Sequence, residues 1–295
     1  MIISASRRTD IPAFYSEWFI HRIREGFCEV PNPFNPSQIS RVSLRPEDVD
    51  VIVFWTRNTS PLFPRLKELD ERGYRYYFLY TVLDYPELLE PHAQPCDNRI
   101  DTVRRLAGTV GDDRVIWRYD PIVLSTITSV DFHKEVFGRI AAELQSATRQ
   151  CVISFVDIYR KLTKRLRWLE ERGCRIREPV AEEVAELAGF IQKTAREHGM
   201  LVKSCAEQID LTPWKVFPGK CIDDVYIAST FGISVEAAKD PSQRPACGCV
   251  ISRDIGCYGT CLHGCRYCYA TSTEEKARAR FAHHDPKAPS LVRGV

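Results

Sequence analysis

The sequence has no long uninterrupted apolar run and no strong excess of charge of either sign. No stretch reaches the roughly 18 apolar residues of a membrane-spanning helix, and the N-terminal MIISASRRTD has no charged leader ahead of an apolar segment. The 41 Lys and Arg residues nearly balance the 39 Asp and Glu residues, which leaves a formal net charge of +2. This balance gives no general attraction to nucleic acid or to a membrane surface. We therefore expect a cytoplasmic protein with no membrane partner.

The sequence also lacks internal repeats, long low-complexity tracts and a glycine-rich phosphate loop after any expected strand. The last absence weakens the nucleotide-binding form of an open, doubly wound α/β sheet. An open sheet without that function remains an alternative to a barrel.

Short apolar runs rich in β-branched and aromatic residues alternate with segments that have helical periodicity, which is typical of βα units and a parallel sheet. The expected strands are residues 1–6, 49–55, 74–83, 114–124, 150–159 and 200–208, and the expected helices are residues 14–26, 61–73, 98–111, 129–147 and 179–199. We predict an α/β fold, a full or partial (β/α) barrel of about six parallel strands over residues 1–210. Residues 211–295, rich in Pro, Gly and Cys, are expected to form a cysteine-rich segment that packs on the barrel mouth.

Polar and aromatic residues end every expected strand, and in barrel enzymes these carboxyl ends form the active-site face. Each residue has a structural alternative; for example, Asp10 could cap a helix and Asp120 could form a turn with Pro121. Taken together they indicate a site around one cavity. The catalytic candidates are Asp10, Arg57, Arg118, Asp120, Asp157 and Lys203. The cofactor-binding candidates are Thr9, Thr56, Tyr80 and Tyr119, with Tyr267 from the cysteine-rich segment.

The 12 cysteines are unevenly distributed. Four stand alone and are interpreted as small apolar or incidental residues, namely Cys28, Cys96, Cys151 and Cys174. In a reducing cytosol, clustered cysteines indicate metal binding or redox chemistry rather than disulfides. The densest cluster is CYGTCLHGCRYCYA, in which Cys261, Cys265 and Cys268 have the spacing C-x3-C-x2-C. Three close thiolates suit one face of a 4Fe–4S cluster with one open iron better than a closed zinc site.

The stretch CLHGCRYCYA resembles the C-x3-C-x-aromatic-C loop of radical S-adenosylmethionine enzymes, especially the form found in relatives of spore photoproduct lyase. The whole chain also resembles an uncharacterised bacterial family with a C-terminal cysteine cluster similar to that superfamily's N-terminal one. The resemblance implies a six-stranded partial barrel, a 4Fe–4S cluster and S-adenosylmethionine as cofactor. It further implies a 5'-deoxyadenosyl radical that abstracts hydrogen from the substrate, and an electron donor such as flavodoxin or ferredoxin.

The order of elements departs from that superfamily, because its cysteine loop follows the first strand and this one follows the sixth. A circular permutation explains the difference if CGCVISRD takes the place of the first strand and MIISASRRTD that of the second. No Gly-Gly-Glu segment, which in the superfamily holds the methionine amino group, is present.

Four further cysteines in the last third of the chain suggest a second site. A second iron–sulfur cluster is favoured for them, and zinc is the alternative, because four thiolates suit either metal. Cys257 is interpreted as a spare thiol or an alternative ligand. The four candidate ligands are Cys205, Cys221, Cys247 and Cys249.

Two functions compete with the radical enzyme. In a metal-stapled nucleic-acid-binding module, arginines would contact phosphates and aromatic rings would stack on bases. In an electron-transfer protein, the clusters would be fully ligated. The substrate of an enzyme is equally open to nucleic acid, peptide and small molecule. The residues assigned to the binding module are Arg7, Arg8, Arg57, Arg118, Trp55, Tyr80 and Tyr119.

Overall fold

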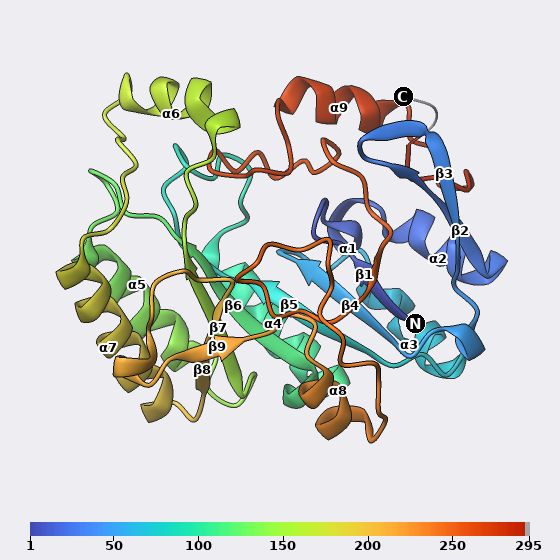
Figure 1. Cartoon of the computed structure of the whole chain (residues 1–295), viewed down its shortest axis with the longest axis horizontal. Coiled ribbons are helices and arrows are strands. Elements are labelled where there is room, and N and C mark those ends of the chain that lie inside the picture. The colour runs from blue at the N-terminus through green and yellow to red at the C-terminus, as the bar shows by residue number, and fades with distance from the viewer. Residues whose placement is uncertain (293–295) are drawn as a thin grey trace.

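The structure is a computed structural model that describes residues 1–292, and its centre is an eight-stranded sheet (Figure 1). All neighbouring strands are parallel, in the order β10-β1-β4-β5-β6-β7-β8-β9. The strands are β1 (Ile2–Ala5), β4 (Val51–Thr56), β5 (Tyr76–Thr81), β6 (Val115–Ile122), β7 (Gln150–Phe155), β8 (Leu201–Cys205), β9 (Phe217–Gly219) and β10 (Arg253–Asp254). The predicted α/β fold with a parallel sheet is confirmed.

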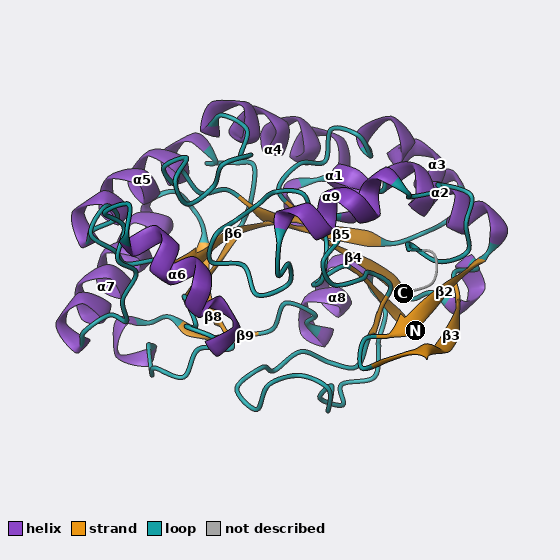
Figure 2. Cartoon of the chain, turned by 90° about the horizontal axis from the view of Figure 1, so that it is seen from above, coloured by secondary structure: helices purple, strands orange, loops and turns teal. Residues whose placement is uncertain are grey.

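The six strands expected from the sequence are the six central strands of this sheet. The two edge strands, β9 and β10, are short and come from the cysteine-rich segment. Within residues 1–292 no pairing joins β9 to β10, so the sheet has two edges. It is curved rather than flat, with a convex and a concave side (Figure 2).

Helices cover the convex side, which we call the outer face (Figure 2). Each follows a strand and has an apolar stripe toward the sheet, and together they bury the larger core cluster. They are α1 (Ile11–Phe14), α2 (Ser16–Glu25), α3 (Leu66–Glu71), α4 (Cys96–Val110), α5 (Val130–Glu143) and α7 (Ala181–Glu197). The five expected helices correspond to α2, α3, α4, α5 and α7.

The concave side, or inner face, is covered by the C-terminal segment. Side chains alternate along β4, so Ile52 and Phe54 point to the helices while Val51 and Val53 point inward. The inward side chains pack against Ile227 of α8 (Asp224–Phe231) and its neighbours. Both faces of the sheet are therefore buried, as the continuous apolar strands require.

The cysteine-rich segment contributes to the sheet itself. Strand β9 pairs with β8, and β10 pairs with β1 through Ile3↔Arg253 and Ser4↔Asp254. The boundary expected near residue 210 thus lies shortly before a strand of the same sheet. The end of CGCVISRD therefore lies beside the start of MIISASRRTD.

Several elements of the structure were not expected from the sequence. An antiparallel hairpin joins β2 (Phe27–Asn32) to β3 (Asn35–Ser43). Helices α6 (Thr163–Glu170) and α9 (Glu274–Ala282) lie at the same end of the sheet (Figure 1). Single 3-10 turns occur at Pro46–Asp48, Phe63–Arg65, Asp112–Arg114, Arg160–Leu162 and Thr212–Trp214. None of the helices within residues 1–292 has the length and apolar character needed to cross a membrane.

Candidate functional site

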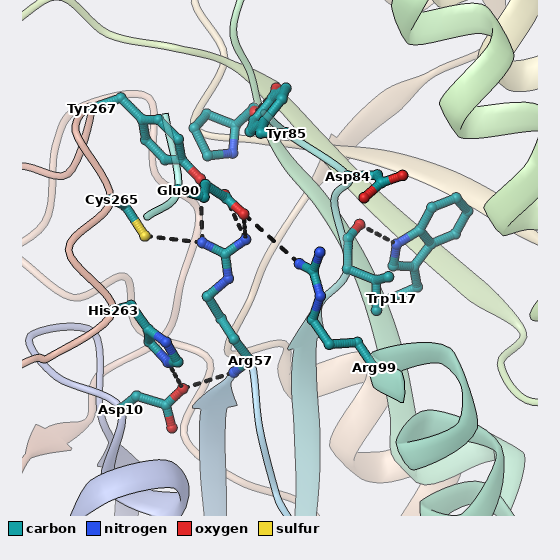
Figure 3. A network of polar contacts seen from close by, with 12 residues as sticks. Asp10, Arg57, Asp84, Tyr85, Glu90, Arg99, Trp117, His263, Cys265 and Tyr267 are labelled. Carbon is teal, nitrogen blue, oxygen red and sulfur yellow. Dashed lines mark hydrogen bonds and ion pairs between the residues drawn. The ribbon is translucent and has the colours of Figure 1, made fainter. Parts of the chain in front are cut away.

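The loop from Cys261 to Cys268, which we call the cysteine loop, lies against the carboxyl ends of β1 and β4 (Figure 3). His263 Nε2 is 2.7 Å from Asp10 Oδ2, and Arg57 Nη1 donates to Cys265 Sγ at 2.9 Å. Asp10 and Arg57 each follow one of those strands. More than 200 residues separate the loop from these partners in sequence, yet it lies on the face at which barrel enzymes build their sites.

Asp10 is a fully engaged carboxylate at this end of β1. Its Oδ1 accepts from the backbone N–H of Ala13 at 3.0 Å, which caps α1, and from Thr56 Oγ1 at 2.8 Å. Its Oδ2 accepts from the backbone N–H of Arg57 at 2.7 Å and contacts His263. The carboxylate therefore fixes the first helix, the end of β4 and the cysteine loop relative to one another.

Arg57 lies between the cysteine loop and a buried glutamate (Figure 3). Its Nη2 donates to both carboxylate oxygens of Glu90, at 2.5 and 2.6 Å, and the Glu90 side chain is fully buried. Tyr267 donates its hydroxyl to the same carboxylate, and Arg99 Nη1 is 3.8 Å from it. Burial and the adjacent Glu90 raise the pKa of Tyr267 well above its usual value, so its hydroxyl keeps its proton. Both cations and the hydroxyl compensate the buried charge.

A glycine lets the cysteine loop approach the segment that carries Glu90. Gly264 has φ +69°, and a Cβ there would lie 2.9 Å from His92 Cδ2 and 3.2 Å from Pro91 Cγ. One residue beyond Cys265, the backbone N–H of Arg266 donates to Leu89 O at 2.9 Å. The loop is thereby fixed along one side.

The other side of the cysteine loop is held by a helix. Arg165 of α6 donates to the carbonyl oxygens of Cys265 and Cys268, at 3.2 and 2.5 Å. The backbone N–H of Ala270 donates to Cys268 Sγ at 3.3 Å. Hydrogen bonds of this kind to cysteine sulfur are among those that tune metal-bound thiolates.

Burial raises the pKa values of two cysteine-loop thiols, those of Cys261 and Cys265. The pKa of Cys265 rises to about 12, mainly through burial and despite the adjacent Arg57. The pKa of Cys261 is raised well above its usual value by burial and then by the charges of Cys268, Asp10 and Cys265. The three thiols are therefore close enough to interact, and a metal would have to displace the protons of Cys261 and Cys265.

A second cysteine group lies on the inner face, and we call Cys205, Cys221, Cys247 and Cys249 the inner-face cysteines. Cys205 Sγ and Cys221 Sγ are 3.1 Å apart. Hydrogen bonding from Cys221 and Cys247 lowers the pKa of Cys249, and bonding with Cys205 and Cys249 raises that of Cys221. These contacts link all four thiols. Within residues 1–292, no group of three or more His, Cys, Asp and Glu side chains is already spaced to hold a metal ion.

The six catalytic candidates fall into separate groups. Asp10 and Arg57 contact the cysteine loop, whereas Arg118 pairs with Asp120 and donates to Cys221 Sγ at 3.0 Å. Two more groups form from the remaining candidates: Lys203 with Asp223, at 3.2 Å, and Asp157 with Arg244. The contacts thus form two centres that contain cysteines and two further ion pairs. That all six residues surround one cavity stays a prediction.

The cofactor-binding candidates take part in different sets of contacts. Thr56 and Tyr267 belong to the network around Asp10 and Glu90. Tyr80 and Tyr119 point to the outer face, where the Tyr119 hydroxyl lies 2.8 Å from His133 Nδ1. Thr9 is buried, and its Oγ1 lacks a hydrogen-bond partner.

Two cavities lie elsewhere on the molecule. One of about 230 Å³ lies beside α6, and another of about 190 Å³ lies between α4 and α5. No predicted site residue lines either of them. Their lining residues are Thr163, Leu166, Arg167, Glu170, Arg175 and Ile176 for the first, and Asp97, Ile100, Asp101, Arg104, Arg139 and Glu143 for the second.

Several residues of the two centres were not identified from the sequence. Glu90 lies in a loop between expected elements, and only its place in an apolar Leu-Leu-Glu-Pro stretch hinted at burial. His263 lies between two of the loop cysteines, which was an available signal. Arg165 is on a helix that was not expected. Asp254 accepts from Ser4 Oγ, Ser6 Oγ and the backbone N–H of Arg7, and thereby fixes β10 to the end of β1.

Comparison with known proteins identifies one family. Residues 2–270 match a family model described as Domain of unknown function (DUF1848), and the matched region includes both cysteine groups. No curated protein matches the chain. Among solved structures, the chain is similar to a crystal structure from Bacteroides thetaiotaomicron VPI-5482 described as a "putative alpha-L-fucosidase". The identity is 11% and the TM-score 0.27, over 81% of this chain and 84% of that one, a similarity too weak to support any argument.

Proposed function

The chain belongs to the DUF1848 family, and we propose that it is a radical S-adenosylmethionine enzyme whose 4Fe–4S cluster is held by Cys261, Cys265 and Cys268. The observation that carries the proposal is the contact of the cysteine loop with Asp10 and Arg57 at the ends of parallel strands. A detached metal knuckle would have no reason to lie on this face of the sheet. Three ligands in so short a loop leave one iron of a cubane free.

The residues present fit such a cluster. Two of the three sulfurs already accept hydrogen bonds, Cys265 from Arg57 and Cys268 from Ala270 N–H. The positive charge of Arg57 opposes the effect of burial at Cys265 and would stabilise a metal-bound thiolate there. When bound, the reduced cluster would supply one electron to cleave S-adenosylmethionine into methionine and a 5'-deoxyadenosyl radical, which abstracts hydrogen from the substrate.

The chain's own residues would act mainly by positioning. Glu90 and Tyr267 hold the guanidinium of Arg57 against the cysteine loop, and Asp10 holds His263. Thr9 Oγ1, a buried polar atom without a hydrogen-bond partner, lies just beyond β1. It is a candidate to bind a polar group of S-adenosylmethionine, in place of the Gly-Gly-Glu segment that the chain lacks.

The same proposal interprets the sheet as a circularly permuted partial barrel. The pairing of β10 with β1 supports it, because the cysteine loop then follows the strand that precedes β1 in space.

The nucleic-acid alternative has less support. The Arg57 and Arg118 side chains are only 12% and 11% exposed and are paired with Glu90 and Asp120, so their guanidinium groups are not free for phosphate.

The proposal is tested by anaerobic reconstitution with iron and sulfide, followed by an assay for 5'-deoxyadenosine release under a strong reductant. The wild-type protein should bind about four iron per cysteine-loop cluster and release 5'-deoxyadenosine. The triple variant Cys261→Ala, Cys265→Ala, Cys268→Ala should lose both that iron and the product.

The matched control is Cys257→Ala, which removes a thiol from the same segment. The Cys257 thiol donates to the carbonyl of Tyr258 at 3.6 Å and is not one of the three proposed ligands, so this variant should retain iron and activity. A triple variant with undiminished iron and sulfide would contradict the cluster assignment. If the protein binds iron but no preparation releases 5'-deoxyadenosine, an electron-transfer protein would be favoured instead.

A further inference from the structure

The inner-face cysteines come from three separate stretches of the chain. Cys205 ends β8, Cys221 follows β9, and Cys247 and Cys249 flank Gly248 shortly before β10. Cys221, Cys247 and Cys249 are at most 8% exposed. The fold thus brings four thiols together beneath the sheet, at a place distinct from the cysteine loop.

The close approach of β9 to β8 brings two of these cysteines together. Gly219 is paired with Cys205, and a Cβ at Gly219 would lie only 2.7 Å from Lys203 Cβ. The absence of a side chain at Gly219 therefore permits the 3.1 Å contact between the sulfurs of Cys205 and Cys221.

The spacing of the Cys205 and Cys221 sulfurs favours one ion over a cluster. In a tetrahedral zinc site with Zn–S bonds of about 2.3 Å, the sulfurs lie about 3.8 Å apart. The observed 3.1 Å contact would have to open by less than about 1 Å to reach that spacing. In a four-iron cube each thiolate binds a different iron, which holds the sulfurs much farther apart.

Positive charge lies beside the thiols. Arg118 donates to Cys221 Sγ at 3.0 Å, and the backbone N–H of Ile222 donates to Cys249 Sγ at 3.4 Å. Arg7 is half-buried and interacts electrostatically with Cys249, and its buried Nη2 atom lacks a hydrogen-bond partner. Four thiolates and one divalent cation carry a net negative charge, which the two guanidinium groups would offset.

We propose that Cys205, Cys221, Cys247 and Cys249 bind one zinc ion with a structural role. Binding displaces the four thiol protons to solvent and forms four Zn–S bonds, without change of oxidation state. The ion joins β8 to the segment that leads into β10, because Cys249 lies four residues before Arg253. This proposal is independent of the radical chemistry and concerns a different set of ligands.

The test is metal analysis of protein purified under anaerobic conditions without added metal, in four forms. Wild type and the cysteine-loop triple variant should each contain about one zinc per chain. The double variant Cys221→Ser, Cys249→Ser should contain none. Cys151→Ala is the matched control, because Cys151 is fully buried but faces the helices, and it should retain its zinc.

A second measurement does not depend on folding of the double variant. Cobalt(II) loaded into metal-free cysteine-loop triple variant should give the strong thiolate charge-transfer and visible bands of a tetrahedral four-sulfur site. Zinc should then displace the cobalt and bleach these bands.

Three results would overturn the proposal. The first is iron and sulfide in the cysteine-loop triple variant that disappear when Cys221 and Cys249 are replaced as well. The second site would then be an iron–sulfur cluster. The second is metal-free protein whose cobalt spectrum lacks thiolate bands. The third is a Cys205–Cys221 disulfide in anaerobically purified protein, identified by mass spectrometry of its peptides.

Discussion

Asp10 both caps a helix and contacts the cysteine loop, so it combines the structural and the site role that its sequence position suggested. Through Oδ1 it caps α1, as a residue before Ile-Pro should. Through Oδ2 it contacts His263 of the cysteine loop. The two readings of Asp10 therefore do not exclude each other, because a carboxylate accepts several hydrogen bonds at once.

At the same scale, the buried ring of His133 leads us to predict that the free energy of unfolding depends on pH. Its Nδ1 lies 2.8 Å from the Tyr119 hydroxyl and its Nε2 3.0 Å from Val123 O, an arrangement that suits the neutral ring. Burial lowers the pKa of His133 to about 4, from 6.5 in the unfolded chain. Between these values the unfolded chain binds a proton that the folded chain does not. The contribution of the neutral His133 ring to the free energy of unfolding is therefore complete above pH 6.5 and is lost as the pH falls toward 4.

Urea unfolding at pH 7 and pH 5 measures this effect. The wild-type free energy of unfolding should fall by about 2 kcal/mol more than that of His133→Gln, which cannot take up the proton. His283→Gln, a change at an exposed histidine, should behave like wild type. Equal pH dependence in wild type and His133→Gln would contradict the assignment of a buried neutral ring.

At the scale of elements, the packing of β9 on β8 depends on Gly219. In Gly219→Ala the new methyl would meet Lys203 Cβ at 2.7 Å and Ser204 O at 3.2 Å, and neither atom is the end of a flexible chain. We expect the free energy of unfolding to decrease by about 1–3 kcal/mol, as for other overpacked sites. Denaturant unfolding measures the change.

Gly108→Ala is the matched control for this substitution. Gly108 lies in α4, and a Cβ there would meet nothing within 4 Å. Alanine should raise the free energy of unfolding by about 0.5–1 kcal/mol, because it restricts the unfolded chain and suits a helix. A destabilisation of similar size in both variants would show that close contact is not the cause.

At the scale of the whole molecule, the C-terminal segment completes the core of the sheet. Val53, Tyr77, Leu79 and Ile116 line the inner face, and α8 with its flanking loops covers them. Without that cover, an extensive apolar surface would meet water. The segment is thus expected to be needed for folding as well as for carrying cysteines.

A fragment that ends at Asp210 tests this expectation. It should unfold without a cooperative transition, bind a hydrophobic dye and elute as aggregates in size-exclusion chromatography, because its inner face is uncovered. The full-length chain, measured in parallel, should be free of these features. A monomeric fragment with a sharp unfolding transition would show instead that residues 1–210 form an independent domain.

The sequence by itself determined the strands, the main helices and the parallel sheet. Runs such as VDVIVFW are too apolar for a sheet with a wet face, and the helices between them carry their own periodicity and glycine ends. It also indicated that Cys261, Cys265 and Cys268 belong together, since their spacing is local. These features depend on neighbours in the chain, and local patterns record them.

Only the tertiary structure decided which distant residues meet. Alternation along β6 sends Arg118 to the inner face and Tyr119 to the helices, although both followed the same expected strand end. Glu90 became a central residue because a loop buries it against Arg57. The pairing of β10 with β1 joins residues about 250 positions apart. No local pattern encodes such contacts, because they follow from the register and curvature of the assembled sheet.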